Sequence, residues 1–201
     1  AESVLLNAIE KDPNNERIYF NARIEILLKT NQAEKAIDIL EKILDKDPDN
    51  TDILYHLALI YQRQERQAES ERVLRHILDV NPDDAFASNG LGYYYAEKGI
   101  KLVEARRLIE NAYRQKPLDW QMLDSMAWLC FREGRNEQAY YFALAAMRSG
   151  FHRVVIVHML DILVALGRQD EAQSVFNELS RRLPNDPKII ELGKRLKLLQ
   201  Q

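Results

Sequence analysis

The chain has 201 residues, of which 46% are hydrophobic and 29% are charged, a balance that suits a folded protein and excludes a disordered one. Its 28 basic and 31 acidic residues are interspersed, and the net charge of -3 excludes a basic stripe for a nucleic acid backbone. A single cysteine, Cys130, excludes a disulfide within the chain. No apolar run approaches the roughly 18 residues that a membrane-spanning helix needs.

Prolines recur at one interval along the sequence. Pro13, Pro48, Pro82 and Pro117 are separated by 35, 34 and 35 residues, and Pro184 lies 67 residues further on, which is two intervals. Proline lacks an amide hydrogen and has a fixed φ, so each of these residues should stand between the end of one helix and the start of the next. The sequence therefore predicts a helical unit that recurs every 34 or 35 residues.

The clearest copy of this unit lies between residues 91 and 117. A Leu-Gly pair is followed by an aromatic residue, then by a small residue with a bulky one four positions later, and then by a proline. These positions are Leu91, Gly92, Tyr95, Ala105, Ile109 and Pro117. The pattern resembles the tetratricopeptide repeat, in which two antiparallel helices bury their apolar faces by stacking on neighbouring copies. We therefore expect an all-α superhelix, an α-solenoid without strands.

The same pattern divides the chain into a single array. Ala1, Leu5 and Pro13 fill the small, bulky and proline positions, so residues 1–15 are expected to be the second helix of a truncated repeat, within a fragment of a longer array. Asp186 and Pro187 predict the start of a capping helix. The five full repeats are predicted at 16–49, 50–83, 84–118, 119–151 and 152–185, and the cap at 186–201.

A search for catalytic residues gives no candidate site. His152 and His158 are six residues apart, which does not place two metal ligands on one face of a helix. Cys130 lies in an apolar helical context that is typical of a buried, inert thiol. No glycine-rich phosphate loop is present. The sequence therefore predicts a non-catalytic protein with no metal and no cofactor.

The first helix of each repeat should line the concave face, and its residues outside the core suggest a binding groove for another protein. Aromatic anchors surrounded by charges are typical of protein-binding hot spots. The alternative is that these side chains pack between neighbouring repeats. A clamp for a terminal carboxylate is disfavoured because no Lys/Asn arrangement recurs. The predicted groove residues are Tyr55, His56, Leu59, Arg63, Asn89, Tyr93, Glu97, Asp124, Trp128, Phe131 and Arg132.

A more specific resemblance begins near Asn89. The segments LGYYYAEKGIKLVEARRLIENAYRQKPLDWQMLDSMAWLCFREGRNEQA and HMLDILVALGRQDEA resemble the C-terminal half of proteobacterial outer-membrane tetratricopeptide lipoproteins, over about residues 89–185. The resemblance implies a periplasmic location on the outer membrane. It also implies an adaptor that binds a C-terminal processing protease and delivers cell-wall hydrolases to it. The chain itself carries neither a signal nor a lipidated cysteine at its start.

These observations lead to one leading function and one alternative. We expect a protein-binding adaptor that recruits a partner, a peptide or a helix in the groove, without nucleic acid or direct membrane insertion. The alternative is a structural segment of an envelope or polysaccharide-assembly scaffold that mainly self-associates.

Overall fold

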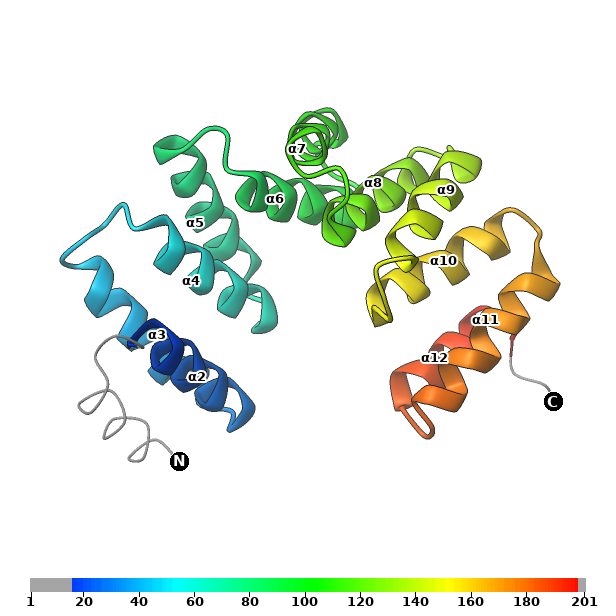
Figure 1. Cartoon of the computed structure of the whole chain (residues 1–201), viewed down its shortest axis with the longest axis horizontal. Coiled ribbons are helices and arrows are strands. Elements are labelled where there is room, and N and C mark those ends of the chain that lie inside the picture. The colour runs from blue at the N-terminus through cyan, green and yellow to red at the C-terminus, as the bar shows by residue number, and fades with distance from the viewer. Residues whose placement is uncertain (1–15, 199–201) are drawn as a thin grey trace. The chain divides into compact units, whose positions relative to one another are not determined.

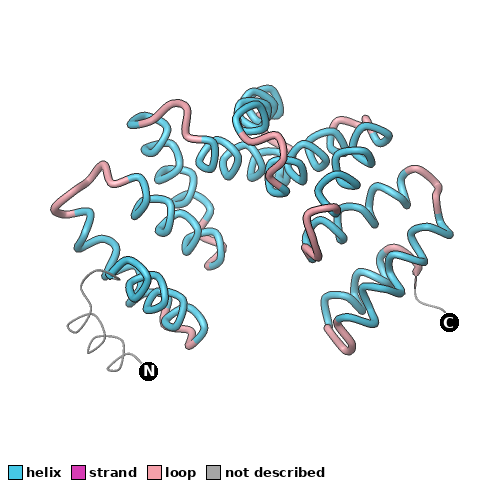
Figure 2. Tube along the Cα trace, viewed as in Figure 1, coloured by secondary structure: helices cyan, strands magenta, loops and turns pink. Residues whose placement is uncertain are grey.

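Every regular element in the computed structural model is an α-helix (Figure 2). The structure describes residues 16–198, and this part of the chain contains eleven helices and no strand. The all-α prediction is therefore confirmed. The helix expected within residues 1–15 and the last three residues of the expected cap lie outside the described residues.

The chain divides into two compact units, residues 1–82 and 83–201. In the described part of the first unit, successive helices contact one another, and each pair is joined by a short turn (Figure 1). These helices are α2 Glu16–Lys29, α3 Ala33–Leu44, α4 Thr51–Arg63 and α5 Gln67–Val80.

The second unit continues the same series of hairpins, and each helix again contacts the next one along the chain. Each predicted repeat range contains two helices, and α12 begins at Pro187 as the Asp-Pro pair predicts. The exact repeat boundaries and the single continuous array stay predictions. The helices are α6 Ala85–Lys98, α7 Leu102–Gln115, α8 Trp120–Arg132, α9 Asn136–Met147, α10 Arg153–Ala165, α11 Gln169–Arg182 and α12 Pro187–Arg195.

The regular spacing of the prolines reflects how the first helix of each repeat begins. Two residues after each of four prolines, an Asn or Asp side chain accepts a hydrogen bond from a backbone N–H in the first turn of the next helix. The caps are Asn50, Asp84, Asp119 and Asp186. At α10, where the proline is missing, the cap residue His152 makes no such side-chain bond. The interval therefore marks a recurrent combination of helix stop and helix cap.

A small residue allows the two helices of the third hairpin to approach closely. Gly92 of α6 faces α7, and a Cβ atom at this position would lie 2.7 Å from Ile109 Cγ1 and 3.1 Å from the carbonyl oxygen of Ala105. Such distances leave no room for a side chain. Ala58 and Ser70 are likewise buried in the second hairpin. The small positions of the sequence pattern are thus points of helix contact.

The turn inside four of the five described hairpins uses a left-handed backbone conformation at the same position. Asn31, Glu65, Gly134 and Gly167 all have positive φ, and each lies just before the residue that precedes the second helix. Glycine and asparagine tolerate this conformation, whereas other residues lose about 1 kcal/mol or more in it. Glu65 is therefore the most strained of the four.

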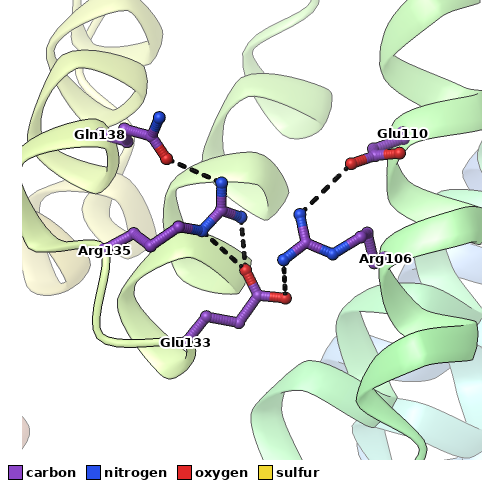
Figure 3. Close-up of polar contacts among 5 residues, drawn as sticks. All are labelled: Arg106, Glu110, Glu133, Arg135 and Gln138. Carbon is purple, nitrogen blue, oxygen red and sulfur yellow. Dashed lines mark hydrogen bonds and ion pairs between the residues drawn. The ribbon is translucent and has the colours of Figure 1, made fainter.

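An ion-pair cluster joins the third hairpin to the fourth (Figure 3). Glu133, at the end of α8, lies between the guanidinium groups of Arg106 on α7 and Arg135 before α9. Arg106 Nη2 is 2.5 Å from Glu133 Oε1, and Arg135 Nη1 donates to Gln138 Oε1 at 2.7 Å. One half-buried carboxylate thus connects consecutive repeats.

Replacing Glu65 with glycine should stabilise the chain by about 0.5–1 kcal/mol, because glycine adopts the φ of 58° at this position without steric cost. The measurement is urea unfolding followed by circular dichroism. Glu65→Ala is the matched control: it removes the same carboxylate but keeps the Cβ atom, so it should change stability little. Equal effects of the two substitutions would show that the strain is not the cause.

Gly92→Ala should destabilise the chain by about 1–3 kcal/mol, because the added methyl group overpacks the contact between α6 and α7. Helix propensity acts in the opposite direction and favours alanine by about 1 kcal/mol. The sign of the change in unfolding free energy therefore separates the two effects. A more stable Gly92→Ala variant would contradict the close approach seen here.

Candidate functional site

In the second unit, the first helices of successive hairpins touch each other directly. Helix α6 contacts α8, and α8 contacts α10, so the three form one layer, which we call the first-helix layer (Figure 1). Side chains one repeat apart can therefore meet on this layer. Arg132 Nη1 donates to the carbonyl oxygen of Glu97 at 2.8 Å across 35 residues, and Asp124 meets His158 across 34.

His158 is the centre of a buried polar group. Its Nδ1 lies 2.9 Å from Oδ1 of Asp124, and its Nε2 lies 3.3 Å from the hydroxyl oxygen of Tyr93. A carboxylate oxygen accepts hydrogen bonds, so Nδ1–H donates to Asp124, and Nε2 is paired with the Tyr93 hydroxyl. This arrangement satisfies both ring nitrogens and links α6, α8 and α10.

Aromatic rings cover the same histidine. The Trp128 ring stacks on His158 with centroids 4.2 Å apart and on Phe131 with centroids 5.1 Å apart. Trp128 Nε1 is buried and has no hydrogen-bond acceptor among the described residues. The indole therefore contributes to this cluster through packing, with its one polar group left unpaired.

The hydroxyl of Tyr93 is held in its protonated form. Burial raises the pKa of this phenol above its usual range, and the nearby carboxylates of Glu97 and Asp124 raise it further. Tyr93 therefore stays a neutral phenol near neutral pH, within hydrogen-bond distance of His158. The three residues Tyr93, Asp124 and His158 connect helices of consecutive repeats, and none of them is an activated nucleophile.

The predicted groove residues fall into two groups. Four lie on α4 in the first unit: Tyr55, His56 and Leu59 are half-buried, and Arg63 is exposed. The His56 ring also contacts the edge of Phe20, with centroids 6.4 Å apart. The other seven lie on α6 and α8 in the second unit. Because each unit is described by itself, one groove running along both stays a prediction.

Within the second group, exposure differs from residue to residue. Glu97 and Arg132 are exposed, as expected for charges at the edge of a binding surface. Asn89, Tyr93, Trp128 and Phe131 are half-buried; of these, Tyr93, Trp128 and Phe131 belong to the cluster around His158.

Asp124 was expected to be an exposed charge at the edge of the groove, but it is buried. Its exposed fraction is only 4%, and its carboxylate faces His158. Trp128 and Tyr93 also contact His158, as the alternative of packing between repeats expects, while both remain half-buried, so their place in a binding groove stays a prediction. The physical reason for these contacts is that stacking of α6, α8 and α10 brings their side chains into mutual contact.

Three residues that connect helices one repeat apart were not predicted as site residues: His158 and Asp161 of α10, and Arg195 of α12. Arg195 of α12 binds Asp161 of α10 with both terminal nitrogens, at 2.6 and 3.1 Å. Both this pair and the Asp124–His158 pair join residues 34 positions apart. A search of the sequence for an acidic residue and a basic residue separated by one repeat interval would have found both pairs.

Residues 16–198 contain no cluster of three His, Cys, Asp or Glu side chains that could hold a metal ion. In the same part of the chain, each helix is too short or too polar to cross a membrane. Cys130 is buried, and this burial raises the pKa of its thiol above the usual value.

Comparison with known proteins identifies the repeat. Residues 27–89 match the family model for the tetratricopeptide repeat. The chain is 31% identical over 135 residues to the TPR repeat-containing protein PA4667 of Pseudomonas aeruginosa. That match includes 67% of this chain but 23% of the relative, so the chain spans about a quarter of its length.

Solved structures share the fold. The thermophilic TPR protein TTC0263 of Thermus thermophilus superimposes with a TM-score of 0.72 at 15% identity, over 99% of this chain and 100% of that one. Pseudomonas aeruginosa PilF superimposes with a TM-score of 0.67 at 20% identity, over 88% of this chain and 82% of that one. At these identities the likeness shows a common arrangement of helical hairpins and no common function.

Asp124→Ala should cost about 3 kcal/mol of unfolding free energy, because it leaves the buried His158 Nδ1 without its partner. Tyr93→Phe is the control within the same cluster; it removes one hydroxyl and should cost about 1 kcal/mol. Urea unfolding monitored by circular dichroism gives both values. If Asp124→Ala costs no more than Tyr93→Phe, the carboxylate does not hold the layer together.

Proposed function

This chain is a tetratricopeptide repeat protein, and we propose that it serves as a non-catalytic adaptor that binds a partner protein through the first helices of its repeats. Proteins of this family are generally scaffolds for protein binding, which supports the proposal. The observation that carries it is the presence of half-buried apolar side chains on a first helix beside its core residues.

That observation is clearest on α4. Leu54, Leu57 and Ala58 are buried in the core of the first unit. Tyr55 and Leu59 lie one helical turn apart on a different stripe and are only half-buried. A half-buried tyrosine and leucine beside the exposed Arg63 make a surface that a partner could cover with a gain in apolar burial.

The chemistry of the described residues favours binding over catalysis. The cysteine is buried and the central tyrosine stays protonated, so neither supplies a nucleophile. The buried histidine already has a partner on each ring nitrogen. These groups support a scaffold in which polar residues connect repeats.

The partner and the location are taken from the resemblance of residues 89–185 to outer-membrane tetratricopeptide lipoproteins. We propose that the chain belongs to an adaptor at the periplasmic face of the outer membrane, and that its partner is a C-terminal processing protease with its cell-wall hydrolase substrates.

A photocrosslinking amino acid at Tyr55 should capture the processing protease in cells that express this protein. The crosslinked product is identified by mass spectrometry. The matched control is the same crosslinker at Tyr141, an exposed tyrosine on the second helix α9 with an exposed fraction of 66%.

The proposal expects capture at Tyr55 and none at Tyr141. Equal capture at both positions would contradict binding through the first helices. Capture of a protein other than a protease at Tyr55 alone would retain the adaptor function and contradict the proposed partner.

A further inference from the structure

A cavity in the second unit is built mainly by α11, the second helix of its hairpin. It has a volume of about 380 Å³ and lies between α11 and the loop that joins α9 to α10. Cavities of this size fall within the range that binds small molecules in proteins. Its buried lining residues are Ile156 and Leu179, which are 7% and 0% exposed. Met147, Phe151 and Val175 also line it, so much of the lining is apolar.

Phe151 stands where the other repeats have a proline. It follows Pro117 by 34 residues and precedes Pro184 by 33. Gly150, just before it, has a φ of 143°, a conformation that glycine adopts without steric cost. Phe151 is 42% exposed and lines the cavity. The junction that departs from the repeat pattern therefore forms one wall of the cavity.

The same loop is anchored on both sides of Phe151. After it, the His152 ring stacks on the Trp120 ring, with centroids 3.9 Å apart. Before it, Ser149 Oγ donates to the carbonyl oxygen of Ala146 at 2.8 Å. The wall is thus held in place without a ligand, which reduces the entropy that binding would cost.

Arg182 lines the cavity with a guanidinium group that is held in one orientation. Its Nε donates to Glu178 Oε1 at 2.7 Å, and its Cζ lies 4.9 Å from the centroid of the Phe151 ring. The side chain is 55% exposed, and no other described residue bonds to its two terminal nitrogens. These nitrogens are arranged as a carboxylate requires for a two-point contact.

The charge around the cavity is positive. The two segments that build it are residues 147–156 and 174–182. Their arginines and their single acidic residue are Arg148, Arg153, Arg181, Arg182 and Glu178. Asp186 pairs with Arg153. Glu178 is shared by Arg181 and Arg182, each at 2.7 Å. Arg148 is exposed and has no ion pair within residues 16–198. Three guanidinium groups thus surround one carboxylate, in a chain whose net charge is -3.

We propose that this cavity binds a small aliphatic carboxylate, a molecule with one carboxylate group and a chain of about six to ten carbons. The carboxylate would pair with the two terminal nitrogens of Arg182, and the chain would cover Met147 and Val175 above Leu179. Glu178 does not compete for an uncompensated cation, because the remaining excess charge around it is positive.

This site goes beyond the proposed function and does not depend on it. The proposed partner surface lies on α4 in the first unit, whereas the cavity lies within the second unit. Binding of a small molecule to the purified chain tests the cavity alone. Crosslinking at Tyr55 tests the adaptor function alone.

Octanoate is the probe, and octylammonium is the matched probe with the same chain length and the opposite charge. Each is titrated into the isotope-labelled chain while amide chemical shifts are recorded by NMR. Octanoate should shift the signals of Gly150, Phe151 and Val175 saturably, with a Kd on the order of 1 mM. Octylammonium should bind at least about tenfold more weakly, because the excess charge around the cavity is positive.

Arg182→Gln should weaken octanoate binding by about fivefold to tenfold, because it removes the two-point contact. Arg181→Gln is the matched control. It makes the same change at the neighbouring residue, which also pairs with Glu178 but does not line the cavity, and it should change affinity by about twofold or less. Val175→Phe should abolish saturable binding, because the added ring fills the cavity. Circular dichroism and thermal unfolding confirm that each variant folds.

Three results would overturn the proposal. One is the absence of saturable shifts at the cavity residues at octanoate concentrations well above the expected Kd. Another is octylammonium binding as tightly as octanoate. The third is an equal loss of affinity in Arg182→Gln and Arg181→Gln, a comparison that decides the case even if Val175→Phe does not fold.

Discussion

The close approach of two helices at small side chains is the constraint on which the structure depends. At Gly92 the neighbouring helix is so near that no side chain fits, and buried Ala105 lies opposite. Helices at this separation bury nearly all the apolar surface between them, and each hairpin then presents further apolar residues to the next one. The contact at Gly92 sets the separation of the two helices within the third hairpin.

The same packing decides which polar residues can meet. First helices that touch bring Asp124 and His158, one repeat apart, into hydrogen-bond distance, and the final helix α12 brings Arg195 to Asp161. Both aspartates are buried, and a buried carboxylate is costly unless a donor faces it. The pairs therefore act as specific links between particular helices, in contrast to the apolar contacts, which many residues could make.

The sequence predicted the fold well because its signals are local. Prolines, the Asn and Asp caps that follow them, and the small positions each act within a few residues, and together they specify hairpins. The site was harder to predict. The exposed positions of Glu97 and Arg132 followed from helical periodicity, but the burial of Asp124 depends on His158, which lies one repeat away on another helix. Periodicity within one helix contains no information about such a partner.

The link between Asp124 and His158 has a consequence for how this array can evolve. Repeat proteins change length by losing or duplicating whole units, which is tolerated when neighbouring units are interchangeable. Loss of the unit containing α10 would place Leu192, the residue one interval beyond His158, opposite Asp124. An aliphatic side chain cannot donate a hydrogen bond to the buried carboxylate. This part of the chain is therefore expected to keep a fixed number of units, while segments joined only by apolar contacts remain free to vary.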